Sequence, residues 1–153
     1  MARNQKTWGY VLEGPGRPER LKQLEAMSIH GVDVSKYGTL WSDKIARGRR
    51  GPNAGRNQLV GRNDLLLAAQ PGDKLVVADT YCLGISPDDV AWFLCALAER
   101  NVGLLVSGIA HIVEPGQDAS DLVADIGRRQ NAANVAACRA RQQSKARELN
   151  KSN

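Results

Sequence analysis

The chain has 153 residues, of which 42% are hydrophobic and 24% charged, and its net charge at pH 7 is +5. This is an ordinary globular composition, long enough to bury one hydrophobic core, and no apolar segment approaches the roughly 20 residues that a membrane-spanning helix needs. The basic excess favours an anionic partner, with nucleic acid as the first candidate.

The three cysteines, Cys82, Cys95 and Cys138, form no Cys-x-x-Cys pair. Their odd number favours reduced thiols, and we expect a cytoplasmic protein. The two histidines, His30 and His111, are far apart and have no ligand partner at metal spacing, so we expect no metal site and no cofactor. The N-terminal MARNQKTWGY lacks the apolar segment that a secretory signal would show.

The first part of the chain predicts two strands around one helix. Residues 7–12 (TWGYVL) are rich in aromatic and branched side chains, which favours a strand. The segment EGPGRPE that follows reads as a tight turn or as a cradle for an anion. Apolar residues at helical spacing predict a helix over 18–30, which Gly31 would end. A second strand region is predicted over 31–41.

Residues 46–60 are rich in arginine, glycine and proline and poor in apolar residues, so we expect a mobile basic loop. A short helix is predicted over 63–69 and a buried strand over 74–79. The segment 86–101 is the clearest helix, because Ser86 suits the N-cap and an apolar stripe follows at helical spacing. Residues 102–107 (VGLLVS) predict the next strand.

Alternation of strands and helices predicts a three-layer α/β fold with a mainly parallel sheet of four or five strands. We assign residues 1–117 to this α/β domain. Residues 118–153 contain no proline and one glycine. As one helix of about 33 residues they would span roughly 50 Å, too long to lie wholly on a small domain, so we expect a projecting basic helix and tail.

The arginines of the loop and the cations of the long helix are the candidate DNA contacts, because such side chains neutralise phosphates. For the helix, the alternatives are a solvated tail or attachment to a membrane surface, for which its mainly alanine apolar face is too thin. The loop is as well explained by solubility as by contact. The candidate DNA-binding residues are Arg47, Arg49, Arg50, Arg56, Arg128, Arg129, Arg139, Arg141, Lys145 and Arg147.

A nucleophile is hard to identify. Ser86 is better explained as a helix cap, and Cys82 follows a strand but has no basic residue close in sequence to lower its pKa. The loop TYCLGIS, which lies where α/β proteins usually carry their chemistry, contains no acid and no basic residue.

Four segments in order resemble the catalytic domain of the serine recombinases, the resolvase/invertase family. GYVLEGPGRPERLKQLEAM resembles the family's first strand and helix, with its G-Y-x-R-V-S-T pattern, and WSDK resembles the end of its second strand. QPGDKLVVADTYCLGIS resembles the family's G-D-x-L-V-V-x-x-L-D-R-L-G-R-S, and LCALAERNVGLLV resembles the helix and strand that follow. The resemblance covers roughly residues 8 to 150.

The resemblance implies a catalytic machinery that this chain lacks. The family's serine, which attacks a DNA phosphate, corresponds to Gly14, and the arginine two residues earlier corresponds to Leu12. The family's D-R-L-G-R loop becomes Tyr81, Cys82, Leu83, Gly84 and Ile85, so that an aspartate and two arginines are absent. A further family arginine falls somewhere between Arg56 and Arg62. The degenerate positions are Leu12, Gly14, Tyr81, Cys82 and Ile85.

The resemblance therefore implies a catalytically inactive, recombinase-like DNA-binding protein with a regulatory or architectural role, encoded by a phage or mobile element. In the family the long helix dimerises and crosses the DNA, which implies a homodimer or higher homo-oligomer. No helix-turn-helix pattern follows, so we expect little sequence specificity. Two alternatives stay open: an active recombinase or another enzyme with a diverged site, and a non-enzymatic subunit that docks to other proteins through the long helix.

Overall fold

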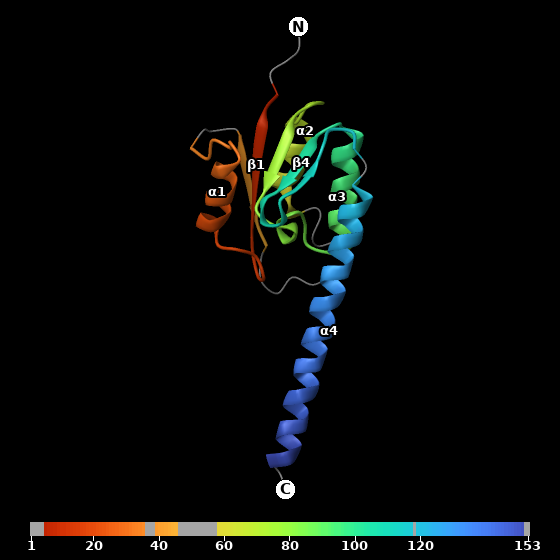
Figure 1. The fold of residues 1–153 in the computed structure, drawn as a ribbon. Coiled ribbons are helices and arrows are strands. Elements are labelled where there is room, and N and C mark those ends of the chain that lie inside the picture. Colours follow the sequence, from red (N-terminus) through yellow and green to blue (C-terminus); the bar gives the residue numbers. More distant parts are fainter. Residues whose placement is uncertain (1–4, 36–38, 46–57, 118, 152–153) are drawn as a thin grey trace.

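The computed structural model describes residues 5–35, 39–45, 58–117 and 119–151, without the side chains of 129–137 and 151. The chain forms an α/β domain followed by a long helix (Figure 1). In order, the elements are β1 (Thr7–Glu13), α1 (Arg20–Ile29), β2 (Leu40–Lys44), α2 (Val60–Ala68), β3 (Lys74–Val77), the 3₁₀ turn η2 (Thr80–Cys82), α3 (Pro87–Glu99), β4 (Gly103–Val106), the 3₁₀ turn η3 (Ser107–Ile109), β5 (His111–Val113) and α4 (Ser120–Lys151).

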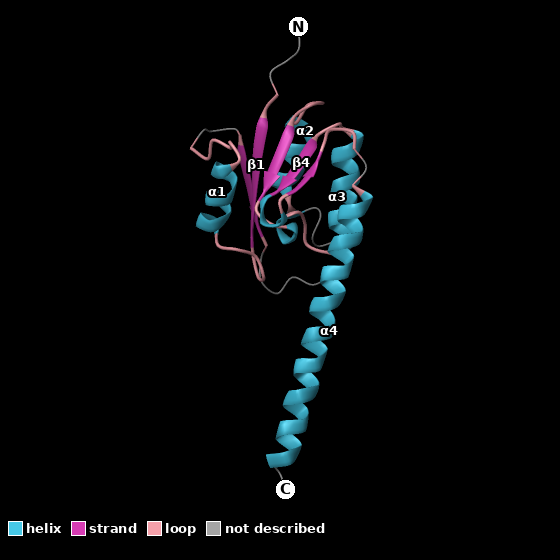
Figure 2. Cartoon of the chain, in the orientation of Figure 1, coloured by secondary structure: helices cyan, strands magenta, loops and turns pink. Residues whose placement is uncertain are grey.

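The predicted mainly parallel sheet is confirmed. Its five strands lie in the order β2-β1-β3-β4-β5, and all neighbours are parallel except β4 and β5 (Figure 2). β1 pairs with both β2 and β3. From β1 the chain continues to β2 at one edge of the sheet, and from β3 it continues in the opposite direction, to β4 and β5. The point between β1 and β3, where the strand order reverses, is where open α/β sheets place their ligand crevice.

Strand alternation builds a separate core on each face of the sheet. Trp8, Tyr10 and Leu12 of β1 point into the larger core, which α2, α3 and the beginning of α4 cover. Val11, the residue between two of them, points into the smaller core, which includes Met27 of α1. Because successive side chains of a strand point to opposite faces, these two cores place helices on both sides of the sheet, in three layers.

Local signals explain why α3 begins and ends where it does. The Ser86 Oγ accepts a hydrogen bond from the Asp89 backbone N–H (3.2 Å), and proline occupies the first turn. Val90, Phe93, Leu94 and Leu97 are buried, so the predicted apolar stripe faces the core. The predicted N-cap and stripe of this helix are thus confirmed.

Two elements begin three or more residues away from their expected positions, and one strand was not predicted. The second strand spans only Leu40–Lys44 and not 31–41, because the residues after α1 form turns that bring the chain back to the sheet edge. α2 begins at Val60 and not at residue 63, and β5 was not predicted. With only three residues, β5 is too short to show a period of its own, and it forms because β4 offers a free edge.

α4 runs from Ser120 to Lys151 as a single helix of 32 residues. Its beginning packs beside α3, where Leu122 is fully buried, whereas residues 138–150 are all exposed. In Figure 1 this later part extends away from the sheet, at the end where β1 terminates.

Candidate functional site

A cavity of about 140 Å³ lies at the carboxyl end of the sheet. Its walls come from the turn after β1, from the loop after β3 and from the start of α3, and α4 contributes one side chain. The position matches the crevice expected where the strand order reverses. The lining residues are Arg17, Thr80, Tyr81, Gly84, Ile85, Ser86, Pro87, Val90 and Ile126.

Arg17, in the turn after β1, forms hydrogen bonds to the loop after β3 on the other side of this cavity. Its Nε donates to the Tyr81 carbonyl (2.9 Å), its Nη2 to the Gly84 carbonyl (2.8 Å) and its Nη1 to the Pro15 carbonyl (2.9 Å). Burial of this half-buried side chain lowers the pKa of its guanidinium, and the opposing influences of Cys82 and Tyr10 are smaller. Arg17 therefore holds the loop after β3 in place, a role that sequence reasoning missed because the partners are distant along the chain.

Among the described residues, no histidine lies beside the hydroxyl groups of the cavity, and the carboxylate that contacts one of them, Asp79, accepts a shorter hydrogen bond from the Thr80 backbone N–H (2.7 Å). The Thr80 hydroxyl donates to Asp79 (3.3 Å), and Ser86 serves as the cap of α3. Neither histidine lines the cavity, and the His30 Nε2 lies instead 3.1 Å from the Ser107 Oγ on the surface. A serine or threonine hydroxyl is a weak nucleophile unless a base or a metal activates it, so this arrangement does not favour nucleophilic attack.

Cys82 is fully buried beneath the loop. Burial raises the pKa of its thiol to about 11, and the opposing influences of the Asp79 backbone and the Arg17 charge are smaller. The thiol is therefore protonated at neutral pH and is not a reactive nucleophile. This agrees with the sequence-based interpretation of Cys82 as a small hydrophobic residue.

We expect the buried thiol to make the folded protein less stable in alkaline solution. The unfolded Cys82 loses its proton near the ordinary cysteine pKa of about 8.5, whereas the folded one keeps it up to about pH 11. Its contribution is therefore complete below the unfolded pKa and is lost as the pH rises through this interval. Urea unfolding measured at several pH values between 8 and 11 should show a falling free energy of unfolding.

The matched control is Cys82→Ala, in which the free energy of unfolding should fall less steeply between pH 8 and 11. Tyr10 should still lower the stability as the pH rises. Burial, followed by the hydrogen bond to Asp43, raises the pKa of the Tyr10 hydroxyl. Thiol labelling gives an independent measurement, since Cys95 and Cys138 are exposed and should react quickly whereas Cys82 should not. Rapid labelling of three thiols in the folded protein would contradict the assignment.

A buried ion pair between Arg62 and Asp89 stabilises the loop after β3. The Arg62 Nη1 and Nη2 donate to the Asp89 carboxylate at 2.8 and 2.9 Å, and Nη1 also donates to the Leu83 carbonyl (3.0 Å). Asp89 in turn accepts from the Ile85 backbone N–H (3.1 Å). The guanidinium carbon lies 4.8 Å from the centre of the Phe93 ring. Arg62, which the sequence placed at the end of a basic loop, is fully buried and is not available to a phosphate.

A second carboxylate fixes the start of α2. Asp43, at the end of β2, accepts hydrogen bonds from the backbone N–H groups of Gly61 and Arg62 (both 2.8 Å) and from the Tyr10 hydroxyl (2.7 Å). A side chain at Gly61 would lie 2.5 Å from the Ser42 carbonyl oxygen, so glycine permits this close approach. Asp43 thereby supplies the helix cap that α2 does not contain in its own sequence.

Three of the positions predicted to be degenerate pack against the larger core. Leu12 and Cys82 are fully buried in the larger core, and Ile85 packs against it partly buried. Tyr81 is 39% exposed at the cavity and accepts the Arg17 hydrogen bond through its backbone. Gly14 lies in the turn after β1, where the Arg17 backbone N–H donates to its carbonyl (3.2 Å).

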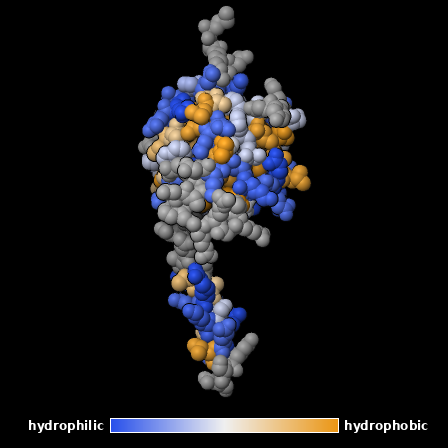
Figure 3. All heavy atoms as spheres, turned by 180° about the vertical axis from the view of Figure 1, so that it is seen from behind, coloured by the Kyte–Doolittle hydropathy of each residue, from blue (hydrophilic) through white to orange (hydrophobic). Residues whose placement is uncertain are grey.

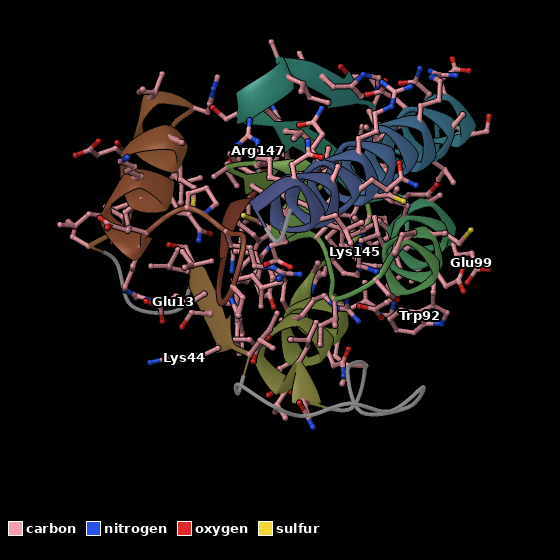
Figure 4. The ribbon with its side chains drawn as sticks, turned by 90° about the horizontal axis from the view of Figure 1, so that it is seen from below. Glu13, Lys44, Trp92, Glu99, Lys145 and Arg147 are labelled. Carbon is pink, nitrogen blue, oxygen red and sulfur yellow. The ribbon has the colours of Figure 1, made fainter. Side chains whose placement is uncertain are left out.

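The predicted DNA contacts fall into two groups. Arg47, Arg49, Arg50 and Arg56 lie outside the described residues, as does the side chain of Arg129. The described members, Arg128, Arg139, Arg141, Lys145 and Arg147, are exposed on α4. Figure 3 shows mainly hydrophilic side chains along the far part of this helix, and Figure 4 shows Lys145 and Arg147 on different sides of it.

The Arg128 Nη2 lies 3.7 Å from an Asp125 carboxylate oxygen, and the two side chains are 73% and 37% exposed. An exposed pair of this kind stabilises little and leaves the arginine accessible. Arg128 is thus compatible with a contact to an external anion, although a carboxylate of the same helix lies nearby.

An apolar groove of about 390 Å³ lies between α3 and the beginning of α4. Alanines of both helices line it together with Leu94, Cys95 and Val123, and Ser120 is a polar member. Within the described ranges no cluster of three or more histidine, cysteine or carboxylate side chains could hold a metal ion. No helix in the same ranges is both long and apolar enough to cross a membrane.

The fold and the cavity together define a mostly parallel α/β domain with a crevice at the carboxyl end of its central strands. No model of a known protein family matches the chain, and no curated protein sequence matches it either.

Proposed function

We propose that this protein is a non-cleaving, serine-recombinase-like protein that binds DNA through the far part of α4. The observation that carries the proposal is the exposed segment 138–150, which bears Arg139, Arg141, Lys145 and Arg147 against a single acid, Glu148. Cations spread along a rod can neutralise successive phosphates, and binding of this kind needs no base-specific contact.

The cavity supports the inactive part of the proposal. The guanidinium of Arg17 donates to three backbone carbonyls, the buried Cys82 thiol beside the cavity is protonated, and no histidine lines the cavity. Loss of a single electrostatic donor commonly costs an enzyme about 100- to 1,000-fold in rate, and here the nucleophile and several donors are missing from the family positions. We therefore infer that the crevice stabilises the fold and cleaves no DNA strand.

Self-association is part of the same proposal. An isolated helix segment is only marginally stable in water, and most helices owe their stability to packing against other elements. The segment 138–150 is exposed along its whole length, so pairing with a second copy or binding to a duplex would stabilise it. A regulatory or architectural role, on a phage or another mobile element, is the use that fits DNA binding without cleavage.

The test is binding of a generic DNA duplex at increasing salt concentration, combined with a cleavage assay. We expect binding at 50 mM salt that weakens steeply as salt is added, because binding releases counterions from the duplex. A suicide substrate that traps covalent protein–DNA intermediates should give no adduct. Absence of binding at 50 mM salt would reject DNA binding, and a covalent adduct would reject the inactive site and favour an active recombinase.

A further inference from the structure

α4 contains one glycine, Gly127, and it lies where the helix leaves the α/β domain. On its N-terminal side Leu122 is fully buried, and Ile126 packs against the larger core and lines the cavity. On its C-terminal side Arg128 has a 73% exposed side chain, and residues 138–150 are exposed throughout. Gly127 therefore lies between the packed start of α4 and the exposed segment 138–150, while the side chains of 129–137 lie outside the described residues.

Among the described residues, no contact requires a glycine at this position. A β-carbon added to Gly127 would meet no atom within 4 Å, whereas one added to Gly84 would lie 2.5 Å from an Asp89 oxygen. Glycine inside a helix is destabilising relative to alanine because it has more backbone freedom to lose. Gly127 is consequently the residue of α4 with the lowest helix propensity, and it directly follows Ile126, which still packs against the domain.

One described ion pair bridges this point of α4. The ion pair between Asp125 and Arg128 spans the glycine, but at 3.7 Å and with both side chains exposed it contributes little. The two flanking segments contain helix-favouring residues, so each can remain helical while the backbone between them bends.

We propose that Gly127 is a hinge about which the arm of α4, residues 128–151, changes its direction relative to the α/β domain. The hinge itself does not depend on what the arm binds. Its use rests on the proposed function: an arm that can reorient follows a bent or variable duplex, and the bound duplex then selects one orientation from those available.

Two native cysteines are placed to measure this motion. Cys95 on α3 and Cys138 on the arm are both exposed, and they lie on opposite sides of the hinge, whereas Cys82 is buried. Spin labels on these two thiols report the distance between the domain and the arm by pulsed electron paramagnetic resonance. We expect a broad distance distribution in the wild-type protein and loss of its broad component in Gly127→Ala, because alanine stiffens the helix without a steric conflict.

The matched control is Ala146→Gly, which introduces the same helix weakness beyond both labels and should leave the distribution as broad as in the wild type. Circular dichroism of each variant checks that α4 remains helical. A wild-type distribution already as narrow as that of Gly127→Ala would overturn the hinge, and so would a broad component that survives the substitution unchanged.

A DNA duplex added to the labelled wild-type protein separates this inference from the proposed function. Narrowing of the distribution on addition of the duplex supports both. A broad distance distribution that narrows in Gly127→Ala but does not change when the duplex is added would support the hinge and contradict DNA binding by the arm.

Discussion

Replacing Asp89 by alanine is expected to lower the free energy of unfolding by about 3–5 kcal/mol, the usual cost of removing one partner of a buried ion pair. Arg62 is fully buried and donates two hydrogen bonds to the Asp89 carboxylate. Without that carboxylate a positive charge remains inside the protein, and the Ile85 backbone N–H loses its acceptor. Urea unfolding monitored by circular dichroism measures the loss.

Asp88, the neighbouring first-turn acid of α3, provides the matched control because it is exposed. Asp88→Ala removes only a favourable interaction with the helix dipole, worth about 0.3–1 kcal/mol. The double variant Arg62→Met with Asp89→Ala should recover part of the stability, since no unpaired charge stays buried. If Asp89→Ala costs no more than Asp88→Ala, the pair does not support the loop after β3.

Replacing Arg139 and Arg141 by glutamine is expected to weaken DNA binding and to flatten the salt dependence of the logarithm of the binding constant by about two units if both side chains contact phosphates. Both residues lie in the exposed segment of α4, so the change should leave the fold intact. Fluorescence anisotropy with a labelled duplex at several salt concentrations gives the slope for each protein.

Arg20→Gln with Lys22→Gln makes the same change in net charge on α1, which lies on the opposite side of the sheet from α3 (Figure 1). Both of these side chains are exposed. We expect this control to keep the wild-type slope. An equal slope change in both variants would mean that overall charge, and not the arm, governs the interaction.

Local patterns were sufficient for the elements that depend on neighbouring residues. The cap at Ser86, the apolar stripe of α3 and the aromatic and branched side chains of β1 are signals within a few residues of each other, and the structure confirms the elements they predict. β5 and the true start of β2 could not be found in this way. A strand of three residues exists only because a neighbouring strand offers hydrogen bonds, and the turns after α1 depend on where the sheet edge lies.

In the candidate site, too, local sequence predicted some features and not others. The sequence placed a loop without acids or bases after β3, and it indicated that Cys82 is a core residue, as the structure confirms. It gave no sign that Arg17 would bind that loop, because the two segments are 64 residues apart at the Arg17–Tyr81 contact.

The sequence by itself determined the mainly parallel α/β class, the helix α3 and the positive charge of the C-terminal segment, because these depend on residue types and short spacings. Only the tertiary structure decided what each arginine does. Arg62 and Arg139 are chemically the same, but the fold brings Asp89 to the first and leaves the second exposed. Burial and partners distant along the chain decide whether a guanidinium stabilises the core or faces solvent, and local sequence predicts neither of them.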